Sequence, residues 1–184
     1  MSLELYNEEE VLRGCQQENR RYQEILYRRF APKMYGICLS YAGDRPLAQD
    51  MLQEAFIKVF RSIKDFRGDG SLEGWVRRIV VRTAIDHLRQ RQSLDKLETE
   101  EFYSESHTQN EALPNLQMGE MISRINKLPD GARVVFNLFA VEGYTHREIA
   151  EELNISEGTS KSQYNRARNL LKGWLGKVDL YEGG

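Results

Sequence analysis

Cysteine is scarce in this sequence, which has two, Cys15 and Cys38, among 184 residues. Two cysteines cannot form the several disulfides that staple small secreted scaffolds, and they suit a reducing compartment. The sequence also lacks any run of about 18 consecutive apolar residues, so it predicts no membrane-spanning helix. Its start, MSLELYNEEE, has an early acidic run instead of the basic and then apolar pattern of a signal peptide. We therefore expect a cytoplasmic protein without direct membrane insertion.

Excess charge of one sign is almost absent as well. The net charge is -2, because 26 basic residues nearly balance 28 acidic ones. This balance excludes a uniformly basic protein that coats nucleic acid. A hydrophobic fraction of 40% is enough for a buried core and excludes a disordered acidic protein.

The acidic excess lies in the middle of the chain, where residues 90–117 hold six acidic and two basic side chains. This stretch is rich in Ser, Glu, Gln, Thr and Asn, and its few apolar residues have no sustained period. It cannot bury enough surface to offset about 1–2 kcal/mol of backbone entropy per ordered residue. We interpret residues 92–117 as a flexible acidic linker between a domain at 1–91 and a domain at 118–184. An ordered acidic loop, or a short helix packed on one domain, is the alternative.

The first domain is predicted to be a helical bundle. Apolar residues at spacings of three and four indicate three main amphipathic helices after a short leading one. Asp44, followed by Pro46, and Ser71 have the features of helix N-caps. No segment alternates as a strand does, so the fold class is all-α. The three stripes run over residues 22–41, 47–63 and 72–88.

Two polar surfaces on these helices are candidates for binding. One lies on the second main helix, where a solvated face is the ordinary interpretation; its members are Gln49, Asp50, Gln53 and Glu54. The other lies on the third main helix, where five arginines stand against Asp86 alone. Guanidinium groups bind phosphate in a fork geometry, although a solvated face with internal salt bridges is equally compatible with the pattern. These arginines are Arg77, Arg78, Arg82, Arg89 and Arg91.

The second domain is predicted to end in a helix-turn-helix. Two helices come first, over residues 118–128 and 134–141, separated by Pro129 and followed by Gly143. Thr145 and Glu148 then have capping-box spacing, which starts a short helix. After a turn, Ser156 is a good N-cap for a second helix. This order is typical of DNA-binding units, and an ordinary surface helix of an all-α domain is the alternative.

The second helix of this unit has two distinguishable faces. Residues that recur at spacings of four and three should face the core: Ser160, Tyr164, Ala167, Leu171 and Trp174. The outward residues are small, polar or basic, as a surface must be to approach base edges. They are Gly158, Lys161, Ser162, Asn165 and Arg166, flanked by Arg168 and Asn169.

Both halves of the chain together resemble one family, the bacterial RNA polymerase sigma factors of the small, two-domain extracytoplasmic-function (ECF) group. AQDMLQEAFIKVF resembles the family's core-binding helix, and DFRGDGSLEGWVRRIVVRTAIDHLR resembles its promoter-melting segment. LPDGARVVFNLFAVEGYTHREIAEELNISEGTSKSQYNRAR resembles its -35-binding domain. The resemblance spans about Glu8 to Leu175 apart from the linker, and the large extra domains of housekeeping sigma factors are missing.

The resemblance implies a role for each candidate surface. The clamp coiled coil of the polymerase's largest subunit would be met by Gln49, Asp50, Gln53 and Glu54. The non-template -10 strand, with one base flipped out, would be held by Arg67, Gly68, Asp69, Gly70, Ser71, Arg77, Arg78, Arg82 and Arg89. The -35 duplex would be read by Lys161, Ser162, Asn165 and Arg166, with phosphates at Thr145, Ser156 and Thr159.

The resemblance also implies partners. These are core RNA polymerase, promoter DNA and an inhibitory anti-sigma factor, which is often membrane-anchored, and the free chain is expected to be a monomer. We hypothesise that the linker sets the separation of the two domains and lets them close together under inhibition.

Two other classes of function compete with this interpretation. A conventional helix-turn-helix regulator would act without binding polymerase, and it would need a dimer seam or a sensor domain. An enzyme such as a metal-dependent nuclease would need a motif, but His87, His107 and His146 fit no ligand spacing with the cysteines. We therefore expect no catalytic residue, no metal site and no cofactor.

Overall fold

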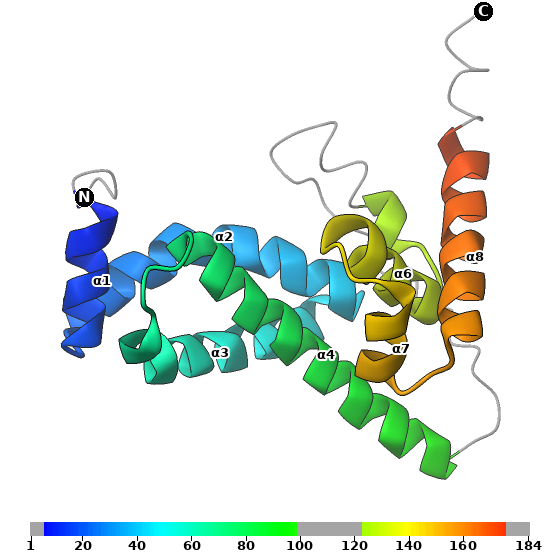
Figure 1. The fold of residues 1–184 in the computed structure, drawn as a ribbon, viewed down its shortest axis with the longest axis horizontal. Helices are drawn as coiled ribbons and strands as arrows, with labels where there is room; N and C mark the ends of the chain where they lie inside the picture. Colours follow the sequence, from blue (N-terminus) through cyan, green and yellow to red (C-terminus); the bar gives the residue numbers. More distant parts are fainter. Residues whose placement is uncertain (1–5, 99–122, 176–184) are drawn as a thin grey trace, which may run out of the picture. The chain divides into compact units, whose positions relative to one another are not determined.

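The computed structural model describes residues 6–98 and 123–175. Within these ranges the secondary structure is helical throughout and contains no strand, which confirms the all-α class (Figure 1). The chain separates into two compact units, Met1–Arg91 and Gln92–Gly184. No helix among the described residues combines the length and apolarity that crossing a bilayer requires.

The first unit contains the predicted short leading helix and three main helices. They are α1 (Glu8–Gln16), α2 (Arg20–Ala42), α3 (Arg45–Ser62) and α4 (Leu72–Glu98), with a 3-10 turn η2 (Ile63–Asp65) after α3. Gly43, at φ 78°, ends α2, and the Asp44 carboxylate then accepts a hydrogen bond from the Leu47 amide at 2.8 Å to start α3. The chain therefore reverses within two residues, and α2 and α3 pack side by side as an antiparallel pair (Figure 1).

Helix α4 lies across this pair and buries its apolar stripe against it. Val76, Val80 and Ala84 have no exposed surface. Polar contacts at the edges tie α4 to both partners, through Lys33 and Glu73 on the α2 side and Lys58 and Asp86 on the α3 side. The helix continues through residues 92–98, so the first part of the predicted linker is helical, while 99–117 lie outside the described residues.

Both cysteines belong to the core of this unit. Cys15 on α1 and Cys38 on α2 are fully buried and free of disulfides. Burial raises the pKa of the Cys15 thiol to about 11 and that of Cys38 to about 12. A thiol with so high a pKa is not a nucleophile near neutral pH, so the cysteines act as small apolar residues.

The second unit begins, among the described residues, with a helical turn at 123–126 and continues as four elements. These are α6 (Asp130–Phe136), the π-helical turn η3 (Asn137–Val141), α7 (His146–Leu153) and α8 (Glu157–Leu175). The helix predicted over 134–141 is therefore helical to its expected end, but it widens after Phe136. The Glu142 amide donates to the Asn137 carbonyl at 3.0 Å, the five-residue spacing of a π turn.

The core of this unit joins its first turn to its last helix. Ile125, Leu128, Ala132 and Ala167 are buried together, and half-buried residues close the cluster from α6 and α8. The closing residues are Phe136, Leu170, Leu171 and Trp174. Since α8 supplies three of these four, one side of α8 is committed to the core and the other is left for contacts outside the unit.

Candidate polymerase and nucleic-acid interfaces

Helix α7 starts at the predicted capping box. The Thr145 hydroxyl accepts from the Glu148 amide at 3.2 Å, and the Thr145 amide donates to the Glu148 carboxylate at 2.8 Å. These bonds, first from the backbone and then from the hydroxyl of Thr145, lower the pKa of Glu148. Asn154, in the left-handed conformation at φ 52°, ends the helix and opens the turn. The predicted helix-turn-helix geometry is therefore present.

Helix α8 presents the two faces that its spacing predicts. Ser160 and Ala167 are fully buried, and Tyr164, Leu171 and Trp174 are half-buried. The opposite face is exposed and contains Gly158, Lys161, Ser162, Asn165 and Arg166, with Arg168 and Asn169 beside them. The Lys161 ammonium lies 3.3 Å from Glu157 one turn earlier, on the same exposed surface. The described face is polar and basic, which suits base edges, and the roles of its residues stay predictions.

The three hydroxyl residues proposed for phosphate contacts are all exposed, but each already takes part in capping. The Ser156 hydroxyl accepts from the Thr159 amide and shares a hydrogen bond with the Thr159 hydroxyl, each at 2.9 Å. The Thr145 hydroxyl donates to the Glu148 carboxylate at 2.7 Å. A phosphate at Thr145 has to compete with that carboxylate, whereas the Ser156 and Thr159 side chains hydrogen-bond to each other.

The loop before α4 is exposed from Arg67 to Ser71. Gly68 and Gly70 have positive φ, 82° and 116°, and open space surrounds both. Phe66 packs on the half-buried Trp75 with ring centroids 5.4 Å apart, and the Ser71 hydroxyl accepts from the Gly74 amide at 3.1 Å. The loop is thus anchored at both ends, while its tip is exposed.

The arginines that follow on α4 divide between two directions. Arg78, Arg82 and Arg89 are separated by four and seven residues, so they share one face of the helix. Arg78 and Arg82 are exposed, and Arg89 is half-buried. Arg77 lies about 120° round the helix from this stripe and is half-buried. The side chain of Arg91 lies outside the described residues.

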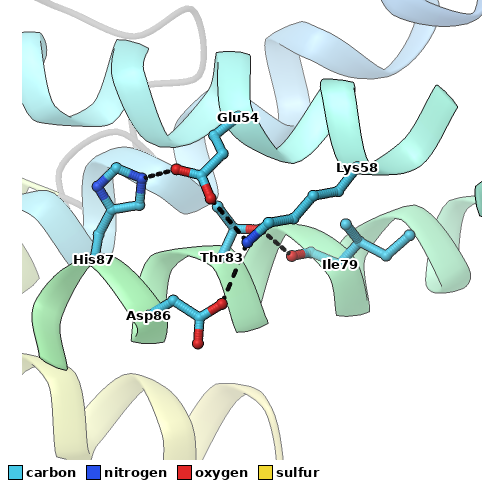
Figure 2. A network of polar contacts seen from close by, with 6 residues as sticks. All are labelled: Glu54, Lys58, Ile79, Thr83, Asp86 and His87. Carbon is cyan, nitrogen blue, oxygen red and sulfur yellow. Dashed lines mark hydrogen bonds and ion pairs between the residues drawn. The ribbon is translucent and has the colours of Figure 1, made fainter. Parts of the chain in front are cut away.

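The predicted polymerase face on α3 is exposed at Gln49, Asp50 and Gln53. Glu54 is different, because it is half-buried and engaged within the protein. Its carboxylate lies 2.7 Å from His87 Nε2 on α4 and 2.9 Å from Lys58 Nζ on α3 (Figure 2).

Lys58 completes a polar bridge between the two helices, since its ammonium also lies 3.2 Å from Asp86 (Figure 2). The hydrogen bond from Lys58 lowers the pKa of Glu54, burial opposes this, and His87 adds a further lowering contact. Burial lowers the pKa of Lys58, but its bonds to Glu54 and Asp86 outweigh that effect and raise it. The sequence interpretation missed this bridge. The Glu54–Lys58 spacing of four residues could have indicated one contact, but nothing local indicates His87.

One apolar residue on this face was also missed. Ile57 is 44% exposed and follows Gln53 by four residues, so it extends the same stripe of α3 by one turn. The spacing put its neighbours Phe56 and Phe60 in the core and gave Ile57 no role.

These features define a class: a two-unit, all-α DNA-binding protein with one helix-turn-helix and a second, arginine-bearing helical surface. Comparison with known proteins identifies the family. Sigma-70 region 2 matches residues 26–94, and sigma-70 region 4 matches residues 118–171. The two matches do not overlap, and together they cover more than half of the chain. The chain therefore belongs to the sigma-70 family of RNA polymerase sigma factors. The expected resemblance is confirmed.

The similar proteins agree with this assignment. The RNA polymerase sigma-H factor of Pseudomonas aeruginosa is 29% identical over 180 residues, covering 89% of this chain and 91% of that one. The ECF RNA polymerase sigma-E factor of Escherichia coli K12 is 29% identical over 175 residues, covering 88% and 90%. A solved structure of the sigma factor RpoE from Bartonella quintana, in complex with the anti-sigma factor NepR, has a similar fold. Its TM-score is 0.55 at 21% identity, covering 85% of this chain and 97% of that one.

Proposed function

We propose that this ECF-type sigma factor binds core RNA polymerase through α3, holds the melted -10 strand on α4 and reads the -35 duplex with α8. The chain directs transcription initiation to a narrow set of promoters and performs no bond-making chemistry itself. The observation that supports this most is that both family regions occur in one chain and that each carries an exposed candidate binding face.

The polymerase contact is assigned to Gln49, Asp50 and Gln53, with Glu54 at its edge. These side chains offer carboxylates and amides at helical spacing, which suit a partner helix with basic and polar residues. The exposed Ile57 adds an apolar anchor to the same stripe, and buried apolar anchors surrounded by polar contacts are typical of protein interfaces. Its exposure in the free chain is explained if a partner covers it.

The -10 contact is assigned to the loop Arg67–Ser71 and to α4. Flipping a base out of its stack costs a few kcal/mol, which the receiving site must offset. The two positive-φ glycines let the loop backbone approach the base, and the stripe with Arg78, Arg82 and Arg89 offers cations for the strand's phosphates. Arg77 lies on a different side of α4 from this stripe, so its contribution to holding the strand should be smaller.

The -35 contact is assigned to Lys161, Ser162, Asn165 and Arg166 on the exposed face of α8. Lys161 and Arg166 suit guanine and Asn165 suits adenine in the major groove. Thr145, Ser156 and Thr159 at the helix N-termini are assigned to phosphates, and Ser156 and Thr159 are better placed because Glu148 already engages Thr145.

An anti-sigma factor is the third proposed partner. The similar sigma factor from Bartonella quintana is described in complex with one, and an inhibitor suits a factor whose exposed binding faces would otherwise be available at all times. We assign the chain to the cytoplasm, as a monomer when free, and its inhibitor to the membrane. Small-angle scattering of the free and inhibited chain tests whether the two domains close together, and unchanged dimensions count against closure.

Reconstituted transcription tests the main proposal. Core polymerase is mixed with the full chain and a genomic fragment library, and the transcripts are sequenced. The expected result is a small set of start sites that share elements near -35 and -10. Failure to initiate at any site overturns the proposal. Specific DNA binding without retention on core polymerase in a pull-down would instead support a conventional helix-turn-helix regulator.

A further inference from the structure

A histidine and a serine connect the two helices of the helix-turn-helix. His146 is the first residue of α7, and Ser160 lies in the first turn of α8. His146 Nδ1 and Ser160 Oγ share a hydrogen bond of 2.9 Å. Ser160 has 0% of its surface exposed, so its hydroxyl cannot exchange this partner for water.

The imidazole of His146 is held in place by aromatic rings on two other elements. It stacks on Phe139 of the π-helical turn, with ring centroids 4.4 Å apart and planes 15° apart. It also meets the edge of Tyr164 on α8 at 5.8 Å, and Tyr164 lies 4.6 Å from Phe139. The ring therefore has one defined position, and so does the hydroxyl that it bonds.

This contact lies next to the face of α8 that is proposed to meet DNA. Ser160 is followed by Lys161 and Ser162, both exposed on the proposed reading face. A shift of the first turn of α8 relative to α7 would move both side chains relative to base edges. We propose that His146 is a positioning residue for -35 recognition: its hydrogen bond to Ser160 sets the orientation of the reading helix. This inference rests on the proposed -35 function of α8.

The physical consequence concerns specificity more than overall affinity. Without the bond, α8 samples more orientations, and only a fraction of them place its side chains within hydrogen-bond distance of the bases. The apparent affinity for the correct sequence falls by that fraction. Contacts to phosphates tolerate small displacements and carry no sequence information, so binding to a wrong sequence should change little.

Three substitutions separate the hydrogen bond from the ring. His146→Phe retains a ring that can stack on Phe139 but removes the bond, and Ser160→Ala removes the bond from the other side. His146→Asn loses the ring but places an amide atom where Nδ1 was, so it can restore the bond. Glu151→Gln, at an exposed position on α7, is the matched control.

The measurement uses full-length chain in holoenzyme and two duplexes. One is a promoter recovered from the transcript mapping, and the other carries the same sequence with its -35 element scrambled. The readout is the specificity ratio, the dissociation constant for the scrambled duplex divided by that for the intact promoter. A merely structural role would lower the folded fraction, which weakens binding to both duplexes equally and leaves the ratio unchanged.

We expect His146→Phe and Ser160→Ala each to reduce this ratio by roughly fivefold to tenfold. Each substitution removes the hydrogen bond between α7 and α8 and leaves the remaining partner, the Ser160 hydroxyl or His146 Nδ1, without it. The double variant should be no worse than either single one, since both act on the same bond. His146→Asn should stay within about twofold of the wild type, and Glu151→Gln should not lower the ratio.

The double variant Lys161→Ala, Arg166→Ala distinguishes a failure of the role given to His146 from a failure of the proposed -35 function of α8. If this pair lowers the ratio and His146→Phe does not, the inference about His146 is overturned while the proposed function stands. If neither changes the ratio, or if the wild type shows no preference for the intact element, both fail.

Discussion

The Glu54 carboxylate on α3 lies 2.7 Å from the His87 imidazole on α4, although the two residues are 33 positions apart in the sequence. Glu54 borders the proposed polymerase face, and His87 lies on the helix proposed to hold the -10 strand. A single contact thus joins the helix that carries one candidate binding surface to the helix that carries the other. Lys58 reinforces it by contacting both Glu54 and Asp86 (Figure 2).

Removing one side of this bridge should destabilise the first unit. His87→Ala leaves the half-buried Glu54 with one partner fewer, and we expect a loss of about 1 kcal/mol in the free energy of unfolding. Urea denaturation of the full chain measures it. Glu24→Gln is the control, because Glu24 pairs with Arg28 on an exposed surface of α2 and should change stability by less than about 0.5 kcal/mol. Equal effects of the two substitutions would contradict the role given to the bridge.

The bridge should also respond to pH in a defined direction. The pKa of Glu54 is lowered from its ordinary value of 4.5, so its ionised form is favoured in the folded state. Its contribution to stability is therefore complete above pH 4.5 and is lost as the pH falls through the lower, folded-state pKa.

The comparison of wild type with Glu54→Gln isolates this contribution. The difference in unfolding free energy between them should be largest near neutral pH and should shrink as the solution is acidified below pH 4.5. Urea titrations at several pH values provide the measurement. A difference that stays constant on acidification would show that the carboxylate charge is not what Lys58 and His87 stabilise.

Local sequence patterns predict much of the fold, because helix caps and amphipathic stripes depend on residues only a few positions apart. Asp44, Ser71, Thr145 and Ser156 all accept the amide hydrogen bonds expected of N-caps. The exposed face of α8 can be predicted from spacing alone. The spacing of the apolar residues identifies the side that packs on the core, and the opposite side is then exposed.

Other features depend on contacts that no local pattern contains. The sequence places Glu54 on a polar face of its helix and does not indicate its contact with His87, because His87 comes from a different helix. The π turn after Phe136 was not foreseen, since its hydrogen bonds differ from those of an α-helix by one residue of register. The environment of His146 requires Phe139, Ser160 and Tyr164 to meet, which only the packing of three elements brings about.

Reversing the charge at Asp50 should weaken polymerase binding and leave the fold intact. Asp50 is exposed, unlike Glu54, so Asp50→Lys tests the surface without disturbing the bridge to α4. We expect retention on core polymerase to fall by at least about tenfold, because a like charge at an interface costs several kcal/mol. Glu24→Lys, an equal charge reversal on α2, should bind as the wild type does. A titration of labelled chain with core polymerase measures the affinity of both variants. A tenfold loss of affinity in Glu24→Lys would show that the effect comes from net charge and not from the position of Asp50.

Gly70, in the loop proposed for the -10 contact, should resist substitution more than a helical glycine does. Gly70 has φ 116°, a conformation that is strained for any other residue, and Gly36 lies inside α2 with open space around it. Gly70→Ala should therefore cost about 1–3 kcal/mol locally and slow open-complex formation. Gly36→Ala should stabilise the chain by about 0.5–1 kcal/mol and leave promoter opening unchanged. Thermal unfolding measures the stability of both variants, and permanganate reactivity of thymines near -10 measures promoter opening. Normal opening with Gly70→Ala would show that the backbone of this loop takes no part in the proposed -10 site.

Phosphate contacts on α4 and base contacts on α8 should differ in their dependence on salt. Arg82 is exposed on the stripe assigned to the strand's phosphates, so Arg82→Ala should reduce the slope of log affinity against log salt by about 0.7–0.9 for each phosphate released. Asn165→Ala should instead reduce discrimination between intact and scrambled -35 elements and leave the slope unchanged, because an amide releases no counterion. Holoenzyme binding measured over a series of salt concentrations separates the two effects. An unchanged slope with Arg82→Ala would mean that this arginine contacts no phosphate, and the -10 assignment would then rest on the loop and on Arg78 and Arg89.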